Sequence, residues 1–391
     1  MKGFGKYIFA RLFLLVSLTV MAPEYHASGQ EVSPTTAVKA ESGLPSLAAT
    51  KECLKDPRSA ECLDNLFREV LRTHSTLEAL QLVEGFEAQD ADLRRDCHPV
   101  VHAIGRETFR LKGNIHDSFS ACDQTCHSGC YHGSVERFLR GDDIYAQTGR
   151  HPSQAEIKRK AASACDPNTP LRLRFQCLHG LGHALMFFSG YELKPSLEAC
   201  DALPDEWSQH SCYGGVFMEN VFNATSEKKN FVATDYHYPC NQVSDKYRGE
   251  CYMMQTSRMT EMGLSTERLL AECAKAEAYR IPCVQSIGRD LSNAARFGEP
   301  RTVAAECELA QGDNRFACMR GVIYALIDNT WDGRYALAFC AAFDSDADGE
   351  SCFKESFQYL RTVFEKSSED IDKDCTRYAV NSRRCIELAA K

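Results

Sequence analysis

The sequence predicts an all-α protein: an α-solenoid of the right-handed type, built from about ten two-helix repeats of roughly 35 residues, each stapled by a disulfide. Three observations predict this fold class. The N-terminal segment is typical of an exported protein, where disulfides form. The chain holds twenty cysteines, most of them in regularly spaced pairs, and apolar residues recur at helical spacing between these pairs.

The first 28 residues have the outline of a cleavable export signal. Lys2, Lys6 and Arg11 precede an apolar run over residues 12–21, and small polar residues follow up to Ser28. The run is shorter than the ~20 apolar residues that cross a bilayer, and no later segment approaches that length. We therefore expect a protein without a membrane span, cleaved near residue 28 and either periplasmic or secreted.

Residues 29–50 are rich in Ser, Thr, Ala and Pro without an apolar period, which predicts a disordered spacer. The disulfide-rich helical domain is then expected to span residues 51–391. The chain carries a formal net charge of -9 and no dense run of Lys and Arg. This charge pattern argues against nucleic acid or an anionic membrane surface as the main partner.

The cysteines define the repeat. Eighteen of the twenty form nine pairs whose members are 8 to 12 residues apart. The second members, together with Cys97, follow one another at steps of 32 to 39 residues, except for a step of 47 between Cys130 and Cys177. In an exported protein such cysteines indicate structural disulfides. The pairs are Cys53/Cys62, Cys122/Cys130, Cys165/Cys177, Cys200/Cys212, Cys240/Cys251, Cys273/Cys283, Cys307/Cys318, Cys340/Cys352 and Cys375/Cys385.

Residues 265–298 show most clearly why each repeat is helical. Apolar residues recur at helical spacing over residues 269–276 and again over 284–294, with a short linker at residues 280–282 between them. Gly298 then ends the second helix. Each cysteine pair falls where the first helix ends and the second begins, so its disulfide closes the hairpin.

Two cysteines, Cys97 and Cys126, remain outside the nine pairs. The second repeat lacks a first cysteine near Glu87, and the third repeat has one too many. We therefore predict a disulfide between Cys97 and Cys126 that joins neighbouring repeats.

Three consecutive second helices carry a histidine followed four residues later by another histidine or by a glutamate. Residues four apart lie on one face of a helix, so both side chains of a pair can reach one ion. Imidazole suits zinc, copper or iron, and an added carboxylate favours zinc or iron. The sequence therefore predicts a divalent transition metal site. Its predicted ligands are His98, His102, His132, Glu136, His179 and His183.

Stacking of the repeats would gather these six side chains into one patch within residues 97–183, where Glu136 is also the candidate catalytic base. The next repeat reads CYGGVFMEN, with Gly214 in place of the histidine and Met218 four residues later. We expect the site to end before that repeat. The histidines outside the pairs are expected on the surface or in loops: His116, His127, His151, His210 and His237.

An alternative interpretation is that the paired histidines cap or pack helices without binding metal. Gly133, Gly180 and Gly182 lie in the same helices, and a helical glycine costs about 1 kcal/mol relative to alanine. Something must approach these glycines closely. The sequence leaves open whether it is a neighbouring helix or a ligand.

Two functions from different classes fit the sequence. The first is an exported metalloprotein with hydrolytic or redox chemistry at the His/Glu site. The alternative is a disulfide-stabilised scaffold that binds a protein or peptide on its concave face without catalysis. The long step also holds an insertion at residues 142–152, which is either an ordinary tolerated insertion or a loop that contacts a substrate near the metal site.

Overall fold

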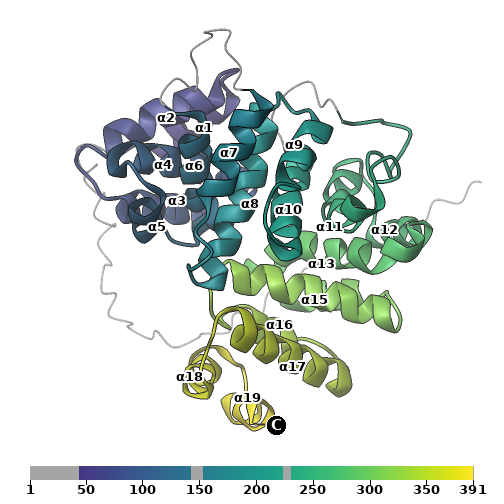
Figure 1. Cartoon of the computed structure of the whole chain (residues 1–391). Helices are drawn as coiled ribbons and strands as arrows, with labels where there is room; N and C mark the ends of the chain where they lie inside the picture. Colours follow the sequence, from purple (N-terminus) through teal and green to yellow (C-terminus); the bar gives the residue numbers. More distant parts are fainter. Residues whose placement is uncertain (1–43, 142–152, 223–229, 391) are drawn as a thin grey trace, which may run out of the picture. The chain divides into compact units, whose positions relative to one another are not determined.

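The computed structural model describes residues 44–141, 153–222 and 230–390, and Figure 1 shows this part of the chain as a set of helices. This described part of the chain forms nineteen α-helices and one short 3-10 helix and contains no β-strand, which confirms the predicted all-α class. The expected export signal, the spacer up to residue 43 and the insertion at residues 142–152 lie outside the described residues. Helix α1 begins at Leu47, earlier than the expected start of the folded domain at Lys51.

The helices follow one another in short hairpins. Those of the first half are α1 (Leu47–Lys55), α2 (Ser59–Val70), α3 (Thr76–Gln89), α4 (Ala91–Lys112), α5 (Ile115–Ala121), α6 (Thr125–Arg140), α7 (Gln154–Ala164), α8 (Leu171–Phe188), α9 (Leu193–Cys200) and α10 (Glu206–Phe222). Those of the second half are α11 (Asp245–Glu261), α12 (Thr266–Lys275), α13 (Arg280–Arg296), α14 (Pro300–Glu308), α15 (Asp313–Asp328), α16 (Ala336–Cys340), α17 (Asp346–Val363), α18 (Ser368–Tyr378) and α19 (Ser382–Ala389). None of these described helices is long and apolar enough to cross a membrane.

Capping residues fix the ends of α3 and α4. Ser75 and Glu78 form a capping box at the start of α3, in which each side chain accepts a hydrogen bond from the backbone N–H of the other. The Asp90 side chain accepts from the Leu93 N–H at the start of α4, and Gly113 ends that helix in the left-handed conformation at φ 78°. Asp96 has non-helical backbone angles that kink α4, so His98 lies at the start of the segment after the kink and His102 lies one turn further along it.

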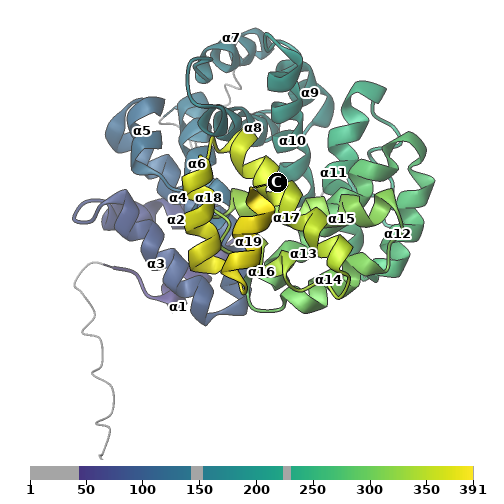
Figure 2. The ribbon, with the colours of Figure 1, turned by 90° about the horizontal axis from the view of Figure 1, so that it is seen from below.

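The second helices of the hairpins pack against one another in chain order. Helix α4 lies between α2 and α6, α8 lies between α6 and α10, and α13 lies between α11 and α15. Helix α15 in turn contacts α17, and Figure 2 shows these later helices side by side. This order brings the ligand pairs of α4, α6 and α8 next to one another.

All ten predicted disulfides are confirmed. The nine hairpin pairs are bonded as the spacing predicts, and Cys97 in α4 is bonded to Cys126 in α6 with their Cα atoms 6.1 Å apart. No cysteine is left as a thiol, and every cysteine of the chain lies within the described residues. So many disulfides fit an extracellular or periplasmic location.

Two repeats depart from the expected unit. The second hairpin, α3 and α4, has no disulfide of its own, because Cys97 is bonded to the next hairpin. The hairpin of α11 has no first α-helix in its described part: residues 230–244, which carry Cys240, form turns. The missing disulfide of α3 and α4 agrees with the predicted Cys97–Cys126 bond, whereas the expectation that every repeat is a two-helix hairpin is wrong for the described part of the α11 repeat.

Glycines allow the closest helix contacts. A Cβ atom on Gly105 of α4 would collide with the Cys130 carbonyl of α6, and one on Gly133 of α6 would collide with the His102 carbonyl of α4. The same reciprocal arrangement joins α8 to α10 and α13 to α15. The sequence left open whether a neighbouring helix or a ligand approaches Gly133 and Gly182. In both cases it is the backbone of a neighbouring helix. The other glycines in these contacts are Gly182 and Gly215, and Gly288 and Gly321.

Contacts between distant parts of the chain bring the second half against the first. Arg296 of α13 lies 3.3 Å from the Glu87 carboxylate of α3. The Tyr131 ring of α6 stacks on Trp331, in the turn after α15, with the ring centroids 5.9 Å apart. Helix α13 therefore contacts α3, and the turn after α15 contacts α6.

Candidate metal centre

The five histidines of the predicted pairs form one cluster. His98 and His102 come from α4, His132 from α6, and His179 and His183 from α8. The centroids of neighbouring rings are 4.5 to 5.7 Å apart. Side chains from three hairpins thus meet at one place, because equivalent positions of adjacent second helices lie side by side.

Three of these histidines could hold a single metal ion. His98, His102 and His183 each offer a ring nitrogen, and the three atoms lie within 4.8 Å of one another. The Nε2 atoms of His98 and His102 are 3.0 Å apart. The Nε2 atom of His183 is buried and has no hydrogen-bond partner. We call these three residues the histidine triad.

The second nitrogen of each triad ring faces an oxygen atom. His98 Nδ1 lies 2.9 Å from the Cys126 carbonyl oxygen, to which it donates a hydrogen bond because a carbonyl only accepts. His183 Nδ1 lies 2.9 Å from Glu219 Oε2, and His102 Nδ1 lies 3.6 Å from Glu136 Oε2. Metal-binding histidines are commonly oriented in this way, with the proton on the outer nitrogen and the lone pair on the inner one.

Burial keeps the cluster neutral. It lowers the pKa of every triad histidine, and for His98 and His183 the neighbouring histidines lower it further. Burial also lowers the pKa of His179 to about 4. Neutral imidazole is the form that binds a metal ion, so no proton must be removed from a charged ring near neutral pH.

Two glutamates stand behind the triad. Glu136 lies 2.8 Å from Arg106 and 2.6 Å from Arg140, both measured to guanidinium nitrogens. Burial raises the pKa of Glu136, but the Arg106 charge and the His102 hydrogen bond outweigh it and the net pKa is below the usual range. Burial raises the pKa of the Glu219 carboxyl, and the nearby Glu136 charge raises it further.

The remaining two histidines of the cluster have other partners. His132 Nε2 lies 3.0 Å from Gln176 Oε1, while its Nδ1 is buried without a hydrogen-bond partner. His179 Nε2 lies 3.2 Å from the sulfur of Met218. The predicted set of six is therefore divided into the triad, one carboxylate behind it and two rings beside it.

Sequence reasoning missed three residues at this site. Met218 and Glu219 of α10 continue the cluster, although the expected site ended before that helix. His127 was expected on the surface or in a loop, but its ring lies 6.4 Å from that of His98 and interacts with Asn293 of α13. His127 is partly buried rather than on the surface, in a stretch where residues 126–128 adopt left-handed φ angles of 52° to 61°.

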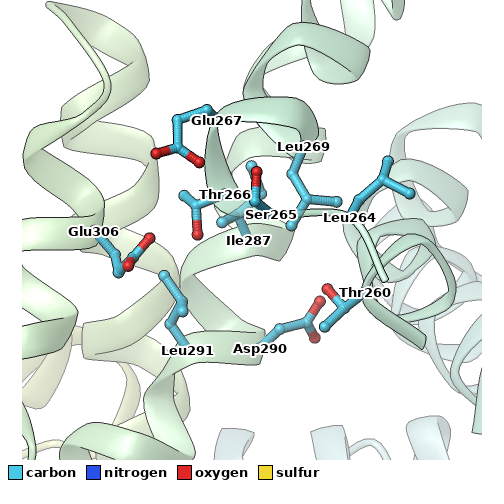
Figure 3. Close-up of a pocket in the computed structure, with 10 residues that line it drawn as sticks. All are labelled: Thr260, Leu264, Ser265, Thr266, Glu267, Leu269, Ile287, Asp290, Leu291 and Glu306. Carbon is cyan, nitrogen blue, oxygen red and sulfur yellow. The ribbon is translucent and has the colours of Figure 1, made fainter. Parts of the chain in front are cut away.

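A separate pocket of about 270 Å³ lies between α11, α12, α13 and α14 (Figure 3). Leucine side chains line it together with the carboxylates of Glu267, Asp290 and Glu306. None of its lining residues belongs to the histidine cluster, so it is a second candidate site rather than an entrance to the first.

Comparison of the chain with protein-family models, with curated proteins and with solved structures found no match. The geometry of the cluster is therefore the basis for assigning a function.

Proposed function

We propose that this is an exported metalloprotein in which His98, His102 and His183 bind one divalent transition ion, zinc, copper or iron. The observation that carries the proposal is the orientation of the three rings. Each turns one nitrogen toward a common point and has an oxygen behind the other. That pattern is typical of metal sites and has no evident purpose in helix packing.

Three protein ligands leave further coordination positions of the ion open. Open positions are typical of catalytic rather than structural sites, since a bound ion there can act as a Lewis acid or in redox chemistry. His98 is only partly buried, which leaves an approach to the centre. We propose metal-dependent hydrolytic or redox chemistry, with the reacting group bound beside His98.

Glu136 has a supporting part in this proposal. Its carboxylate is engaged by two arginines and faces the outer nitrogen of His102. A carboxylate held in this way orients a ligand and offsets the charge of the ion, whereas a catalytic base needs a free lone pair near the substrate. We therefore assign Glu136 and Glu219 to positioning the triad.

The frame around the site is part of the proposal. The second helices follow one another in chain order, and the three that carry the cluster are joined by close glycine contacts and by the Cys97–Cys126 disulfide. We propose that the hairpins form the right-handed α-solenoid that the repeats predict. Its inner row of helices would hold the ligands rigidly, as a preorganised site requires.

Removing a triad ligand should abolish metal binding. We expect untagged wild-type protein to bind one ion per chain and His183→Ala to bind none, because only two of the three ligands remain. Metal content after dialysis, and thermal denaturation with and without metal, measure this. A saturating ion at about 100 times its Kd should stabilise the wild type by about 2.7 kcal/mol and the variant not at all.

The matched control is His210→Ala. His210 lies on α10 beside Glu250 and outside the cluster, so its removal should leave metal binding unchanged. A wild-type protein that binds no transition ion, or a His183→Ala variant that keeps it, would contradict the proposal.

Loss of the carboxyl group behind a ligand should weaken binding without abolishing it. Glu219→Gln keeps the shape of the side chain but replaces the carboxyl, which can ionise when a cation binds to His183, with an amide that cannot. We expect metal affinity to fall about 10- to 100-fold, as for other changes behind a ligand. Competition with a chelator of known affinity measures it, and an unchanged affinity would show that Glu219 does not orient the ring.

The second candidate function, a protein- or peptide-binding scaffold, is favoured by the pocket between α11 and α14. Figure 3 shows Glu267 and Glu306 near one end of this pocket and Asp290 near another. Asp290 is already paired with Arg289 of α13, so Glu267 and Glu306, with the apolar walls beside them, are the carboxylates that suit the cationic end and aliphatic stem of a Lys or Arg side chain. Titration with a basic peptide, compared between wild type and Glu306→Gln, tests it.

A further inference from the structure

A sulfur atom and a ring nitrogen face each other beside the triad. The Met218 sulfur of α10 lies 3.2 Å from His179 Nε2 of α8. Helices α8 and α10 are held in close contact by Gly182 and Gly215, whose missing side chains allow their backbones to approach. The two donor atoms are therefore placed by a rigid helix pair and not by a loop.

The proton of the His179 ring is most favourably placed away from this sulfur. The ring also forms a hydrogen bond with the backbone of Ser211, and its Nδ1 atom is on the side of Gly214, 3.4 Å from where a Cβ would lie. With the proton on Nδ1, Nε2 presents a lone pair to Met218. A thioether has no proton to donate. Two lone pairs then face each other, an arrangement that a soft cation between them would stabilise.

A third donor lies next to this pair. The His132 ring centroid is 5.3 Å from that of His179, and its Nδ1 atom is buried without a hydrogen-bond partner. Gln176 engages the other nitrogen of this ring, so the free nitrogen is the one that carries the lone pair. A buried nitrogen of this kind costs free energy unless something binds it.

We propose that His179 and Met218, together with His132, form a second metal site that takes a soft monovalent ion, cuprous copper. Thioether and imidazole ligands select Cu(I) among the biological metals. Thiolates would bind it more strongly, but all twenty cysteines of this protein are in disulfides. The His/Met set is therefore the soft donor set that the cluster offers.

The charges around this second site also favour a monovalent ion. The Arg289 guanidinium of α13 acts on His179 electrostatically, and it is 2.6 Å from the Asp290 carboxylate, which offsets much of its charge. Coulomb repulsion from the remaining positive charge is half as large for a +1 ion as for a +2 ion. A divalent ion is better placed at the triad, where Glu136 and Glu219 stand behind the ligands.

This second site goes beyond the proposed divalent centre and does not require that centre to be occupied. Its decisive variant is Met218→Leu, which removes the sulfur with little change in volume. Met253→Leu is the matched control, because Met253 is partly buried like Met218 but lies outside the cluster. Both variants are first checked for wild-type thermal stability and for Zn(II) binding at the triad.

The test is an anaerobic titration of Zn(II)-loaded protein with Cu(I), in competition with a coloured Cu(I) chelator. We expect wild type and Met253→Leu to bind one Cu(I) per chain, and Met218→Leu to bind it about 100-fold more weakly. Substitution of a residue that only orients a ligand typically lowers metal affinity about 10- to 100-fold. We expect a loss at the upper end of this range because Met218 would be a direct ligand. X-ray absorption should show a copper–sulfur distance in wild type and control only.

Three outcomes would overturn the second site: equal Cu(I) affinity in all three proteins, copper without sulfur coordination in wild type, or Cu(I) binding that is lost in His183→Ala but kept in Met218→Leu. The last result would place copper at the triad. If instead wild type takes no Zn(II), the divalent proposal fails, and the Cu(I) titration of metal-free protein still decides between Met218→Leu and its control.

Discussion

Gly133→Ala should destabilise the protein by about 3 kcal/mol or more and disturb the metal centre. A Cβ atom on Gly133 would overlap the His102 carbonyl oxygen, which is backbone and cannot rotate away. Helices α4 and α6 would have to separate, although Gly105 and the Cys97–Cys126 disulfide hold them together. Thermal denaturation of metal-free protein measures the loss of stability, and chelator competition measures the accompanying loss of metal affinity.

Gly85→Ala is the control for this substitution. Gly85 lies inside α3, and nothing approaches the position that its Cβ would take. Because alanine is the better helix former, this change should stabilise the protein by up to about 1 kcal/mol. We expect Gly133→Ala to lower the free energy of unfolding and Gly85→Ala to raise it. Small changes of similar size in both variants would mean that α4 and α6 tolerate separation.

The disulfide framework could be predicted because nine of its ten bonds join cysteines that are close together in the sequence. A cysteine pair 8 to 12 residues apart spans one helix–helix turn, and the same turn recurs along the chain. Even the Cys97–Cys126 bond was predictable, because these two cysteines remained after the other eighteen had been assigned to regularly spaced pairs. The turn segment before Cys240 could not be predicted, because the cysteines keep their regular spacing there although the described residues form no first helix.

The candidate site was predictable only where identical residue types repeat. The i and i+4 histidines of α4 and α8 stand out, and helix stacking then brings them together. Met218 and Glu219 occupy the same face of the next helix but belong to other residue types, so the repeat of histidines did not include them. His127 depends on left-handed backbone at three non-glycine residues, which no local propensity favours.

The role proposed for Glu136 differs from the predicted ligand and catalytic base for a different reason. Its position four residues after His132 is that of a ligand, but what it does depends on Arg106, from the preceding hairpin. Arg106 also contacts Asp64 of α2, 2.7 Å away. The three charged groups come from three different hairpins and are all buried. Such an interaction is non-local, and the sequence gives no indication of which charges will pair.

Arg106→Met should therefore be among the most damaging substitutions in the protein, costing about 3 to 5 kcal/mol at neutral pH. It leaves two buried carboxylates, Asp64 and Glu136, without the cation between them. Thermal denaturation measures the loss. Arg72→Met is the control, because Arg72 forms an exposed pair with Glu69 and its removal should have no measurable effect.

The pH dependence of this variant separates a lost ion pair from lost packing. In wild type the net pKa of Glu136 in the folded state is below the usual range. Its contribution is present above the unfolded pKa of about 4.3 and is lost as the pH falls through the folded pKa. Without Arg106, the largest pKa-lowering interaction is lost and the folded pKa of Glu136 moves up toward the unfolded one, so the variant lacks much of this contribution. The gap between the proteins should be widest near neutral pH and should narrow in acid, whereas a packing defect would give a constant gap.

The same variant connects stability to metal binding. With Arg106 gone, Glu136 loses the 2.8 Å contact that holds it behind His102 Nδ1. We expect metal affinity to fall about 10- to 100-fold even where the protein is fully folded, because the ring is no longer oriented. Arg106→Lys keeps the charge but cannot bridge two carboxylates with a planar fork, so it should restore part of the stability and less of the affinity. Full affinity in Arg106→Met would mean that His102 is oriented by helix packing alone and that Glu136 contributes nothing to the centre.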